Sequence, residues 1–369
     1  MTFESLYKKS GFKALTPIQK ELKENLKPGL NIVGIAPTGT GKTHAFLFPI
    51  LSYLDVKKEI IQVIIVVPTF ELINQTYKFC NQLNSGFTIK CYDPKVNMDE
   101  EIVKLQNGKF PQIIIGTPSK ISRISKSISL KTTKFLVLDE ADMLFQDDFM
   151  KDIDSFYANL KNVTTILMSA TYTKAMDPFI KKYFGRFKMI DTYSKHSTRI
   201  KNQLIKVTGK ERIDFFYDVI STFEPFSAFV FVSNNQQLED VYQAIRKKTK
   251  SVAMLSSNIS LTDRKNTIAK VLKNEFQYLV TSDLGSRGLD FDVSHIINYD
   301  LPKNLEFFTH RIGRTGRMDR NGLTITFYDD KDKDNIAKLK KTIKFEEVVL
   351  TKDGLSLKRK REKKEEKQK

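Results

Sequence analysis

The feature that most constrains the fold is an alternation of short, β-branched apolar runs with stretches whose apolar residues have helical spacing. The runs have the length and composition of buried parallel strands, and they cover residues 31–35, 63–67, 112–115, 135–138, 165–168, 228–232, 278–281, 295–298 and 323–327. Helical spacing occupies the stretches between them, for example 70–83, 149–160 and 236–248. The runs fall into two series, so we predict an α/β chain with two tandem doubly wound parallel-sheet domains.

The length of 369 residues also favours two domains, because one domain usually holds about 150 residues. The segment 191–201 is polar, has no clear period and separates the two series of strands. We therefore predict a first domain over 1–192, a linker over 193–202 and a second domain over 203–350. The segment 351–369 is predicted to be a short disordered basic tail, because its last twelve residues hold eight basic and three acidic side chains and no apolar one.

The formal net charge of +18 indicates a polyanionic partner such as nucleic acid, although a lysine-rich solvated surface would give the same balance. Cys80 and Cys91 are the only cysteines and form no CxxC pair, so neither a disulfide framework nor a zinc site is indicated. The chain has no secretory signal and no run of about 18 apolar residues, so we expect no membrane span. Together these observations predict a soluble intracellular protein.

The segment 36–43, Ala-Pro-Thr-Gly-Thr-Gly-Lys-Thr, follows the first predicted strand and opens a helical stretch. It has the composition of a phosphate-binding loop, with alanine in place of the first glycine. Gly39 and Gly41 let backbone N–H groups converge on an anion, and the helix N-terminus adds partial positive charge. Lys42 is placed to neutralise the β and γ phosphates, and Thr43 to ligate Mg²⁺.

A pair of carboxylates follows the predicted strand 135–138. Asp139 and Glu140 stand at the C-terminal end of that strand, where an α/β sheet binds its ligand. An Asp-Glu pair in isolation is usually a solvated turn. After a phosphate loop, Asp139 is instead expected to hold Mg²⁺, usually through water, and Glu140 to orient and deprotonate an attacking water.

With these motifs in this order, residues 11–327 resemble the DEAD-box RNA helicases. The tetrapeptide 139–142 is the motif after which that family is named. The segment 11–19 is similar to the family's adenine-recognition motif, in which the amide of Gln19 would pair with adenine N6 and N7. Ser-Ala-Thr at 169–171 resembles the motif that couples ATP state to domain closure. The resemblance implies two RecA-like domains and an enzyme that hydrolyses ATP.

The resemblance also implies a nucleotide site with ATP as substrate and Mg²⁺ as cofactor. The implied nucleotide-binding residues of the first domain are Gln19, Thr38, Gly39, Gly41, Lys42 and Thr43, and the implied Mg²⁺ ligands are Thr43 and Asp139. In the second domain, Gly288 and Asp290 are implied to line the nucleotide.

The segment 310–317 resembles the family motif that supplies arginines to the γ-phosphate. A guanidinium fork suits this task because charge spreads over the phosphoryl oxygens in the transition state. The implied catalytic residues are Lys42, Asp139, Glu140, Arg314 and Arg317.

Two loops of the first domain, 68–72 and 117–120, resemble the RNA-contacting loops of the family, which bind phosphates through backbone N–H groups and hydroxyls. Phe70 stands where the family usually has arginine, and Ser119 where it usually has glycine. These departures put the RNA contacts of the first domain in doubt.

Two further departures concern RNA and adenine. Arg264 matches a family position that touches RNA, but Leu261 replaces the glutamine usual three residues earlier. The aromatic residue that in the family precedes the adenine motif has no counterpart, so adenine stacking is lost or supplied by Phe3 or Phe12.

We therefore expect an ATP-dependent RNA helicase that clamps RNA and separates short duplexes locally, in ribosome biogenesis or RNP remodelling. An ATP-gated RNA clamp or assembly scaffold, and a DNA helicase on the same fold, are the alternatives. The expected partners are RNA and protein cofactors that supply specificity, for a chain that is itself monomeric. By analogy the nucleus or nucleolus is the expected location, with the cytoplasm as the alternative. The basic segment 358–361 leaves open a nuclear localisation signal, an RNA tether or a solvated tail.

Overall fold

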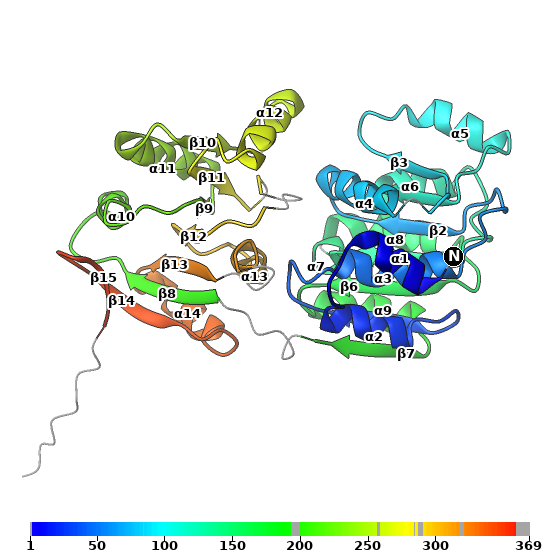
Figure 1. Cartoon of the computed structure of the whole chain (residues 1–369), viewed down its shortest axis with the longest axis horizontal. Helices are drawn as coiled ribbons and strands as arrows, with labels where there is room; N and C mark the ends of the chain where they lie inside the picture. The colour runs from blue at the N-terminus through cyan, green and yellow to red at the C-terminus, as the bar shows by residue number, and fades with distance from the viewer. Residues whose placement is uncertain are drawn as a thin grey trace, which may run out of the picture. The chain divides into compact units, whose positions relative to one another are not determined.

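The computed structural model describes residues 2–83, 85–145, 147–192, 200–256, 259–283, 285–286, 291–316 and 321–358. The chain separates into two compact units that divide at about residue 197. Each unit has its own sheet with helices packed against it (Figure 1). No helix in these ranges is long and apolar enough to cross a membrane.

The first unit contains a seven-stranded sheet with the order β3-β4-β2-β5-β6-β1-β7, and every strand pair in it is parallel. The strands are β1 Asn31–Ile35, β2 Val63–Val66, β3 Ile89–Tyr92, β4 Ile113–Gly116, β5 Phe135–Asp139, β6 Thr164–Ser169 and β7 Phe187–Asp191. Their C-terminal ends therefore lie along one edge of the sheet, which carries the phosphate-binding loop and the Asp-Glu pair.

Helices cover both faces of this sheet (Figure 1). They are α1 Phe3–Ser10, α2 Pro17–Asn25, α3 Lys42–Ser52, α4 Phe70–Gln82, α5 Met98–Gln106, α6 Pro118–Ser125, α7 Ala141–Leu144, α8 Asp147–Tyr157 and α9 Asp177–Tyr183. Successive strand residues point to opposite faces, so Ile65 joins the core with Leu22 and Phe46, whereas Ile64 joins the core with Phe156. Burial on both faces explains why inner strands such as β2 and β4 are apolar throughout rather than alternating.

The second unit contains an eight-stranded sheet with the order β10-β11-β9-β12-β13-β8-β14-β15. The strands are β8 Ile200–Lys206, β9 Ala228–Val232, β10 Val252–Leu255, β11 Tyr278–Ser282, β12 His295–Asn298, β13 Gly322–Tyr328, β14 Glu346–Thr351 and β15 Gly354–Leu357. The helices are α10 Arg212–Ile220, α11 Asn235–Lys248, α12 Leu261–Leu272, α13 Glu306–Ile312 and α14 Lys333–Leu339. All strand pairs are parallel except β14 and β15, which form an antiparallel hairpin.

The predicted fold class is confirmed, and each of the nine predicted strands is present with ends that agree to within one residue. Two predicted segments differ from the structure. Strand β8 begins at Ile200, inside the predicted linker 193–202, because it pairs with β13 over its whole length.

The predicted disordered tail 351–369 begins too early, because β15 continues the second sheet to Leu357. The hairpin turn ends at Gly354, which has a φ of +104°, a backbone conformation that glycine adopts without steric cost. The next residue, Leu355, packs against the core of the second unit. The remainder of that tail, 359–369, lies outside the described residues, as does most of the predicted linker.

Candidate active site

The phosphate-binding loop runs from the end of β1 to the start of α3. Gly39 and Gly41 have φ of +77° and +81°, the left-handed region that favours glycine. A Cβ at Gly41 would also lie 2.5 Å from Nε2 of Gln19. The helix α3 begins at Lys42, so its free N–H groups and the positive end of its dipole face the loop. This arrangement suits a bound anion.

Lys42 is buried within that loop, with 6% of its surface exposed. Its Nζ donates to the carbonyl of Ala36 at 3.2 Å and to that of Pro37 at 3.5 Å. The same nitrogen lies 3.9 Å from Oε1 of Glu140. The ammonium group is thus held beside the loop that would surround a phosphate.

The predicted carboxylate pair meets the loop at the C-terminal end of β5. Asp139 is buried, and its Oδ2 accepts a 3.5 Å hydrogen bond from Oγ1 of Thr43. Burial, and then the neighbouring Glu140 carboxylate, raise the pKa of Asp139 to about 7. The carboxylate and the threonine hydroxyl are oxygen ligands of the kind that a hard divalent cation binds. The charge of that cation would in turn stabilise the ionised form of the desolvated carboxylate.

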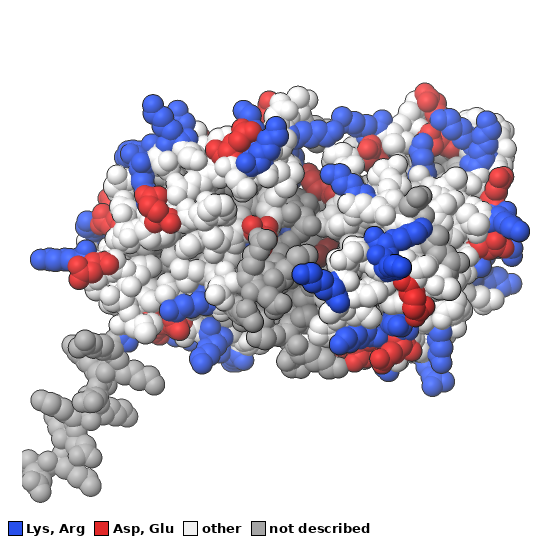
Figure 2. Space-filling model, viewed as in Figure 1, with Lys and Arg blue, Asp and Glu red and all other residues white. Residues whose placement is uncertain are grey.

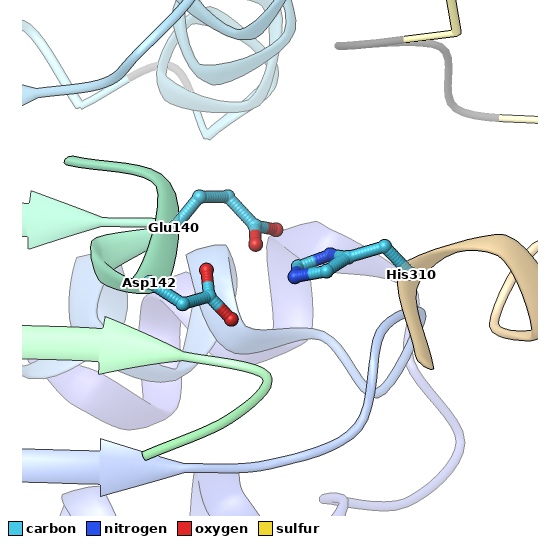
Figure 3. Close-up of side chains that lie close together, drawn as sticks. All are labelled: Glu140, Asp142 and His310. Atoms are coloured by element: carbon cyan, nitrogen blue, oxygen red, sulfur yellow. The ribbon is translucent and has the colours of Figure 1, made fainter. Parts of the chain in front are cut away.

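Glu140 has a strained backbone, with φ of 53° and ψ of 51°. Non-glycine residues seldom adopt this left-handed conformation, which Asn162 and Asn274 also have here, and strained residues of this kind cluster at functional sites. The backbone N–H of Glu140 donates to Oδ1 of Asp139 at 3.0 Å, which fixes the two residues relative to each other. Figure 3 shows the Glu140 side chain beside Asp142, and it also labels His310, a residue of α13 in the second unit.

Asp142 connects this strand end to the next one. Its Oδ2 accepts hydrogen bonds from Oγ1 of Thr171 at 2.8 Å and from the backbone N–H of Thr171 at 3.1 Å. The backbone N–H of Asp142 donates to Oγ of Ser169 at 3.2 Å. The structure thus brings together the two motifs that the sequence places at 139–142 and 169–171.

Gln19 is buried on α2 and lies next to the loop. Its Oε1 accepts a 3.0 Å hydrogen bond from the backbone N–H of Thr16, which completes a capping box, and its Nε2 donates to the carbonyl of Gly41 at 3.4 Å. An adenine contact by Gln19 would have to share or replace these bonds, because the amide has only two N–H groups and two lone pairs.

The aromatic side chains proposed to stack on adenine pack within the first unit. Phe12 lies edge to face against His44, with ring centroids 4.9 Å apart, and Phe3 lies edge to face against Phe48 at 5.6 Å. Both rings are partly buried against the core that contains Phe48.

The residues of the first unit fit a magnesium-bound nucleotide. Besides the Thr43 and Asp139 oxygens, Oγ1 of Thr38 is buried and has no hydrogen-bond partner among the described residues. A buried hydroxyl without a partner is costly, and a phosphate oxygen would satisfy it. Glycines with left-handed backbone conformation leave room for that phosphate.

Part of the predicted site in the second unit is described. Arg314 follows α13, and its backbone N–H donates to the carbonyl of Arg311 at 3.1 Å. Gly288, Asp290 and Arg317 lie outside the described residues. Arg264, predicted to touch RNA, donates from Nη1 to the carbonyl of Gly285 at 2.9 Å.

The three positions that depart from the family pattern each lie in the first turn of a helix. Phe70 is the first residue of α4, which Thr69 caps by accepting a hydrogen bond from the N–H of Leu72. Ser119 lies in the first turn of α6, and Leu261 is the first residue of α12. The helix N-termini at Phe70 and Ser119 keep their backbone N–H groups as phosphate donors despite the altered side chains.

One functional feature was not predicted from the sequence. Arg311 is buried and donates to Asp283 through Nε at 2.6 Å and Nη2 at 2.8 Å. The only signal in the sequence is that polar residues follow the strands ending at Ser282 and Asn298, which would place them at one sheet edge.

Residues 16–179 match the family model for the DEAD/DEAH box helicase, and residues 211–319 match that for the helicase conserved C-terminal domain. The chain is 32% identical over 354 residues to the DEAD-box ATP-dependent RNA helicase CshB of Bacillus subtilis, an alignment that covers 93% of this chain and 80% of the relative. It is 31% identical to CshB of Staphylococcus aureus, with 88% of this chain and 74% of the relative covered.

A solved structure of Dbp5 from S. cerevisiae bound to RNA and ADP BeF3 shares the fold. Its TM-score is 0.78 at 24% identity, with 94% of this chain and 93% of that chain covered. Both halves of the chain are thus covered by helicase family models, and the chain belongs to the DEAD-box family of ATP-dependent RNA helicases.

Proposed function

We propose that this helicase binds ATP with Mg²⁺ on its first domain and hydrolyses it in response to RNA, and that it separates short duplexes locally. The observation that carries the proposal is the cluster at the end of β5, where Lys42, Thr43 and Glu140 surround the buried carboxylate of Asp139. The names of the CshB relatives, and the RNA and nucleotide bound to Dbp5, support it.

Each residue of the cluster has a separate task in this proposal. Lys42 neutralises the β and γ phosphates, which the glycines of the loop admit. Thr43 and Asp139 hold Mg²⁺, which when bound supplies positive charge to the phosphate oxygens. Glu140 accepts the proton of the attacking water. Its Oε1 lies 3.9 Å from Nζ of Lys42, so the carboxylate is already held beside the loop before the water arrives.

The second domain contributes Arg314 and Arg317 to the γ-phosphate in this proposal, and Gly288 and Asp290 to the nucleotide. Developing charge on the phosphoryl oxygens then attracts guanidinium groups from a different domain. Hydrolysis would depend on both domains, which makes RNA that binds both of them an activator.

RNA attraction has a general electrostatic basis in this chain. The net charge of +18 raises the local concentration of a polyanion. Figure 2 shows lysine and arginine side chains spread over both units in that view, with acidic side chains between them. We infer that the charge steers RNA nonspecifically, and that protein cofactors supply the choice of RNA.

Steady-state ATP hydrolysis with and without single-stranded RNA tests the proposal. Stimulation by RNA and not by matched DNA is expected, and Glu140→Gln is expected to lower kcat by about 10² to 10⁴-fold, the usual contribution of a general base. The substitution keeps the size of the side chain and removes its charge and basicity, so ATP binding is the control and should persist. Hydrolysis that DNA stimulates equally, or that survives in the variant, would contradict the proposal.

The alternative function is an ATP-gated RNA clamp or assembly scaffold with little unwinding, which the replacement of the arginine usual in the family by Phe70 leaves open. It predicts long-lived RNA complexes with a nonhydrolysable ATP analogue and slow hydrolysis.

The monomeric state, the location in the nucleus or nucleolus and a role in ribosome biogenesis stay predictions. Fluorescent tagging in the source cell checks the location.

A further inference from the structure

An apolar cavity of about 150 Å³ opens at one end of the second sheet. The sheet and the loop before β12 line it with Phe229, Leu279 and Phe291, and the C-terminal end of α12 lines it with Val271 and Leu272. Figure 1 shows α12 beside β10. All of these residues belong to the second unit, so the cavity is a feature of one folded unit.

The cavity lies at the N-terminal ends of the strands. The lining residues Ala228 and Leu279 stand at the starts of β9 and β11, which are parallel to each other and to β12. The loop that follows β11, where Arg264 donates to the carbonyl of Gly285, lies at the other end. A strand rises by about 3.3 Å per residue, so the length of β11 separates the two ends by about 13 Å. A group in the cavity therefore leaves the C-terminal ends of the strands free for nucleotide and RNA.

Two strongly exposed apolar side chains adjoin the cavity. Leu272, which lines it, is 60% exposed. Phe226, which directly precedes the lining residue Ser227, is 80% exposed. Phe276 also lines the cavity and is partly buried. Apolar side chains that gather around a hollow indicate a site where a partner removes them from water.

The size and lining of the cavity indicate which apolar group it would hold. A volume of about 150 Å³ is enough for one benzene-sized group. The rings of Phe229 and Phe291 lie edge to face, with centroids 5.7 Å apart. A third ring packed against such a pair gains more free energy than its buried area alone provides. One phenylalanine side chain of a peptide therefore suits the cavity.

Three lysines surround the cavity. Lys270 and Lys273 lie at the end of α12 and are exposed. Lys250 is also exposed and precedes Ser251, whose carbonyl accepts a 2.9 Å hydrogen bond from the N–H of the lining residue Gln277. Within the part of the chain that the structure describes, none of the three lysines forms an ion pair. Their positive charge is therefore available to a ligand.

Carboxylates near the cavity do not cancel this charge. Glu224, which accepts a hydrogen bond from Gln277, is already paired with Lys248 at 3.1 Å. Glu275 is exposed, and Asp292 lines the cavity and is partly buried. Three lysines thus stand against two carboxylates, on a chain whose net charge is +18. This balance favours a ligand with acidic residues.

We propose that this cavity, together with Phe226 and Leu272, is a docking site for an acidic peptide segment of a partner protein, which inserts one phenylalanine side chain. The inference gives a binding site to the protein cofactors of the preceding subsection, and it rests on the proposal that such cofactors act on this helicase. The phenylalanine supplies affinity through burial, whereas the lysines select an acidic partner and speed its encounter. The partner remains bound while nucleotide and RNA occupy the opposite ends of the strands.

Two other occupants fit the cavity less well. A second copy of this chain also carries a net charge of +18, so two copies repel each other. The last twelve residues of the chain itself hold no apolar side chain that could fill an apolar cavity. A partner of opposite charge that carries a phenylalanine meets both requirements.

Methyl NMR spectroscopy of the full-length protein tests the docking with a defined probe. The probe is the peptide Gly-Glu-Asp-Glu-Phe-Glu-Asp-Glu-Gly, and two reference peptides replace its phenylalanine by alanine or its acidic residues by lysine. We expect the probe to shift the methyl signals of Val271, Leu272 and Val293, and not those of Leu357. The alanine peptide is expected to bind about 10- to 100-fold more weakly, the factor for burying one phenylalanine, and the lysine peptide is also expected to bind more weakly than the probe.

Leu272→Gln and Leu357→Gln form a matched pair of variants. Each leucine is 60% exposed, but Leu357 lies on β15 and does not line the cavity. We expect Leu272→Gln to lower the affinity for the probe at least about threefold, the factor for one buried methylene group, and Leu357→Gln to keep it. Lys273→Glu is expected to lower the affinity as well and to make it less dependent on salt.

RNA-stimulated ATP hydrolysis is measured on the same samples and reports the proposed function separately. We expect Leu272→Gln and Lys273→Glu to hydrolyse ATP as the wild-type protein does, because the cavity lies away from the C-terminal ends of the strands. Should the wild-type protein fail to respond to RNA, the proposed function falls, while the peptide titration still tests the docking site.

The docking site is rejected if the probe at millimolar concentration leaves the signals of Val271 and Leu272 unshifted. Equal affinity of the alanine peptide, or equal affinity of Leu272→Gln and the wild-type protein, would also overturn the proposal, and tighter binding of the lysine peptide would overturn the choice of an acidic partner. A dimer in sedimentation that Leu272→Gln dissociates would identify a second copy as the occupant instead. If Leu272→Gln does not fold, Phe226→Gln replaces it with the same expected loss of affinity.

Discussion

The protonation state of His44, a residue near the phosphate loop, is set by the side chains that surround it. It follows Thr43 on α3, and its ring centroid lies 4.9 Å from that of Phe12, 5.5 Å from that of Phe48 and 4.5 Å from that of Phe79. Burial lowers the pKa of His44 from 6.5 to about 4. The imidazole is therefore neutral at physiological pH and acts as a packing group.

This burial predicts a loss of stability in mild acid. Between pH 6.5 and 4 the unfolded chain takes up a proton on His44 that the folded chain excludes, so the free energy of unfolding falls as pH falls. The contribution of His44 to this fall is about 3 kcal/mol by pH 4. Urea unfolding of the wild-type protein and of His44→Phe at pH 7, 5.5 and 4 checks it. The variant is expected to lose less stability over this range, and parallel curves for the two proteins would refute the prediction.

At the scale of elements, the hairpin of β14 and β15 completes the second sheet. Strand β14 pairs with β8, with Val348 opposite Ile205, and the Val348 side chain is 3% exposed. Without the hairpin, β8 would present an unpaired edge, which favours aggregation. The hairpin is thus part of the domain even though the charged residues Lys352 and Asp353 form its turn.

Truncation of the chain tests the contribution of this hairpin. Ending the chain after Phe345 removes both strands and is expected to lower the free energy of unfolding by at least about 2 kcal/mol, the value of burying one valine, and to promote aggregation. Ending it after Lys358 removes only the segment beyond the hairpin and is expected to leave the unfolding temperature unchanged. Equal stability of the two truncated proteins would show that the hairpin is dispensable.

At the scale of the whole molecule, the residues proposed to act on ATP are divided between two units, each with its own core and sheet. The phosphate loop and the carboxylates belong to the first unit, whereas Arg314 belongs to the second. If nucleotide binding tightens RNA binding, linkage requires that RNA tighten nucleotide binding by the same factor.

We expect a nonhydrolysable ATP analogue to tighten single-stranded RNA binding by about 5 to 150-fold, the usual range for coupled sites. RNA should tighten the binding of the analogue by the same factor. Fluorescence anisotropy measures the affinity for RNA with and without the analogue, and the affinity for the analogue with and without RNA. Arg314→Ala serves as the control, because it should reduce the coupling while RNA affinity without nucleotide persists. Binding of the two ligands that is independent in the wild-type protein would contradict the clamp and the helicase alike.

The sequence by itself determined the features that neighbouring residues control. The buried strands have apolar runs because both of their faces are covered, so the runs were visible without a structure. The glycines of the phosphate loop, and the Thr16 and Gln19 pair that caps α2, likewise act on residues close in the chain. The phosphate loop, the Asp-Glu pair and the segment 169–171 each directly follow a predicted strand, so a parallel sheet was expected to bring these three motifs to one edge.

Only the tertiary structure decided the edges of the sheets and the contacts made across them. Strands β3 and β7 lie at sheet edges and have mixed polarity, β14 begins with two glutamates, and β15 alternates leucine with glycine and serine. Their pairing depends on hydrogen bonds to a neighbouring strand, which composition does not reveal. The partners of Arg311 come from segments far apart in the chain, and they meet because parallel strands bring their C-terminal ends to one edge. A guanidinium group selects such partners by distance and angle, and the fold alone sets these quantities.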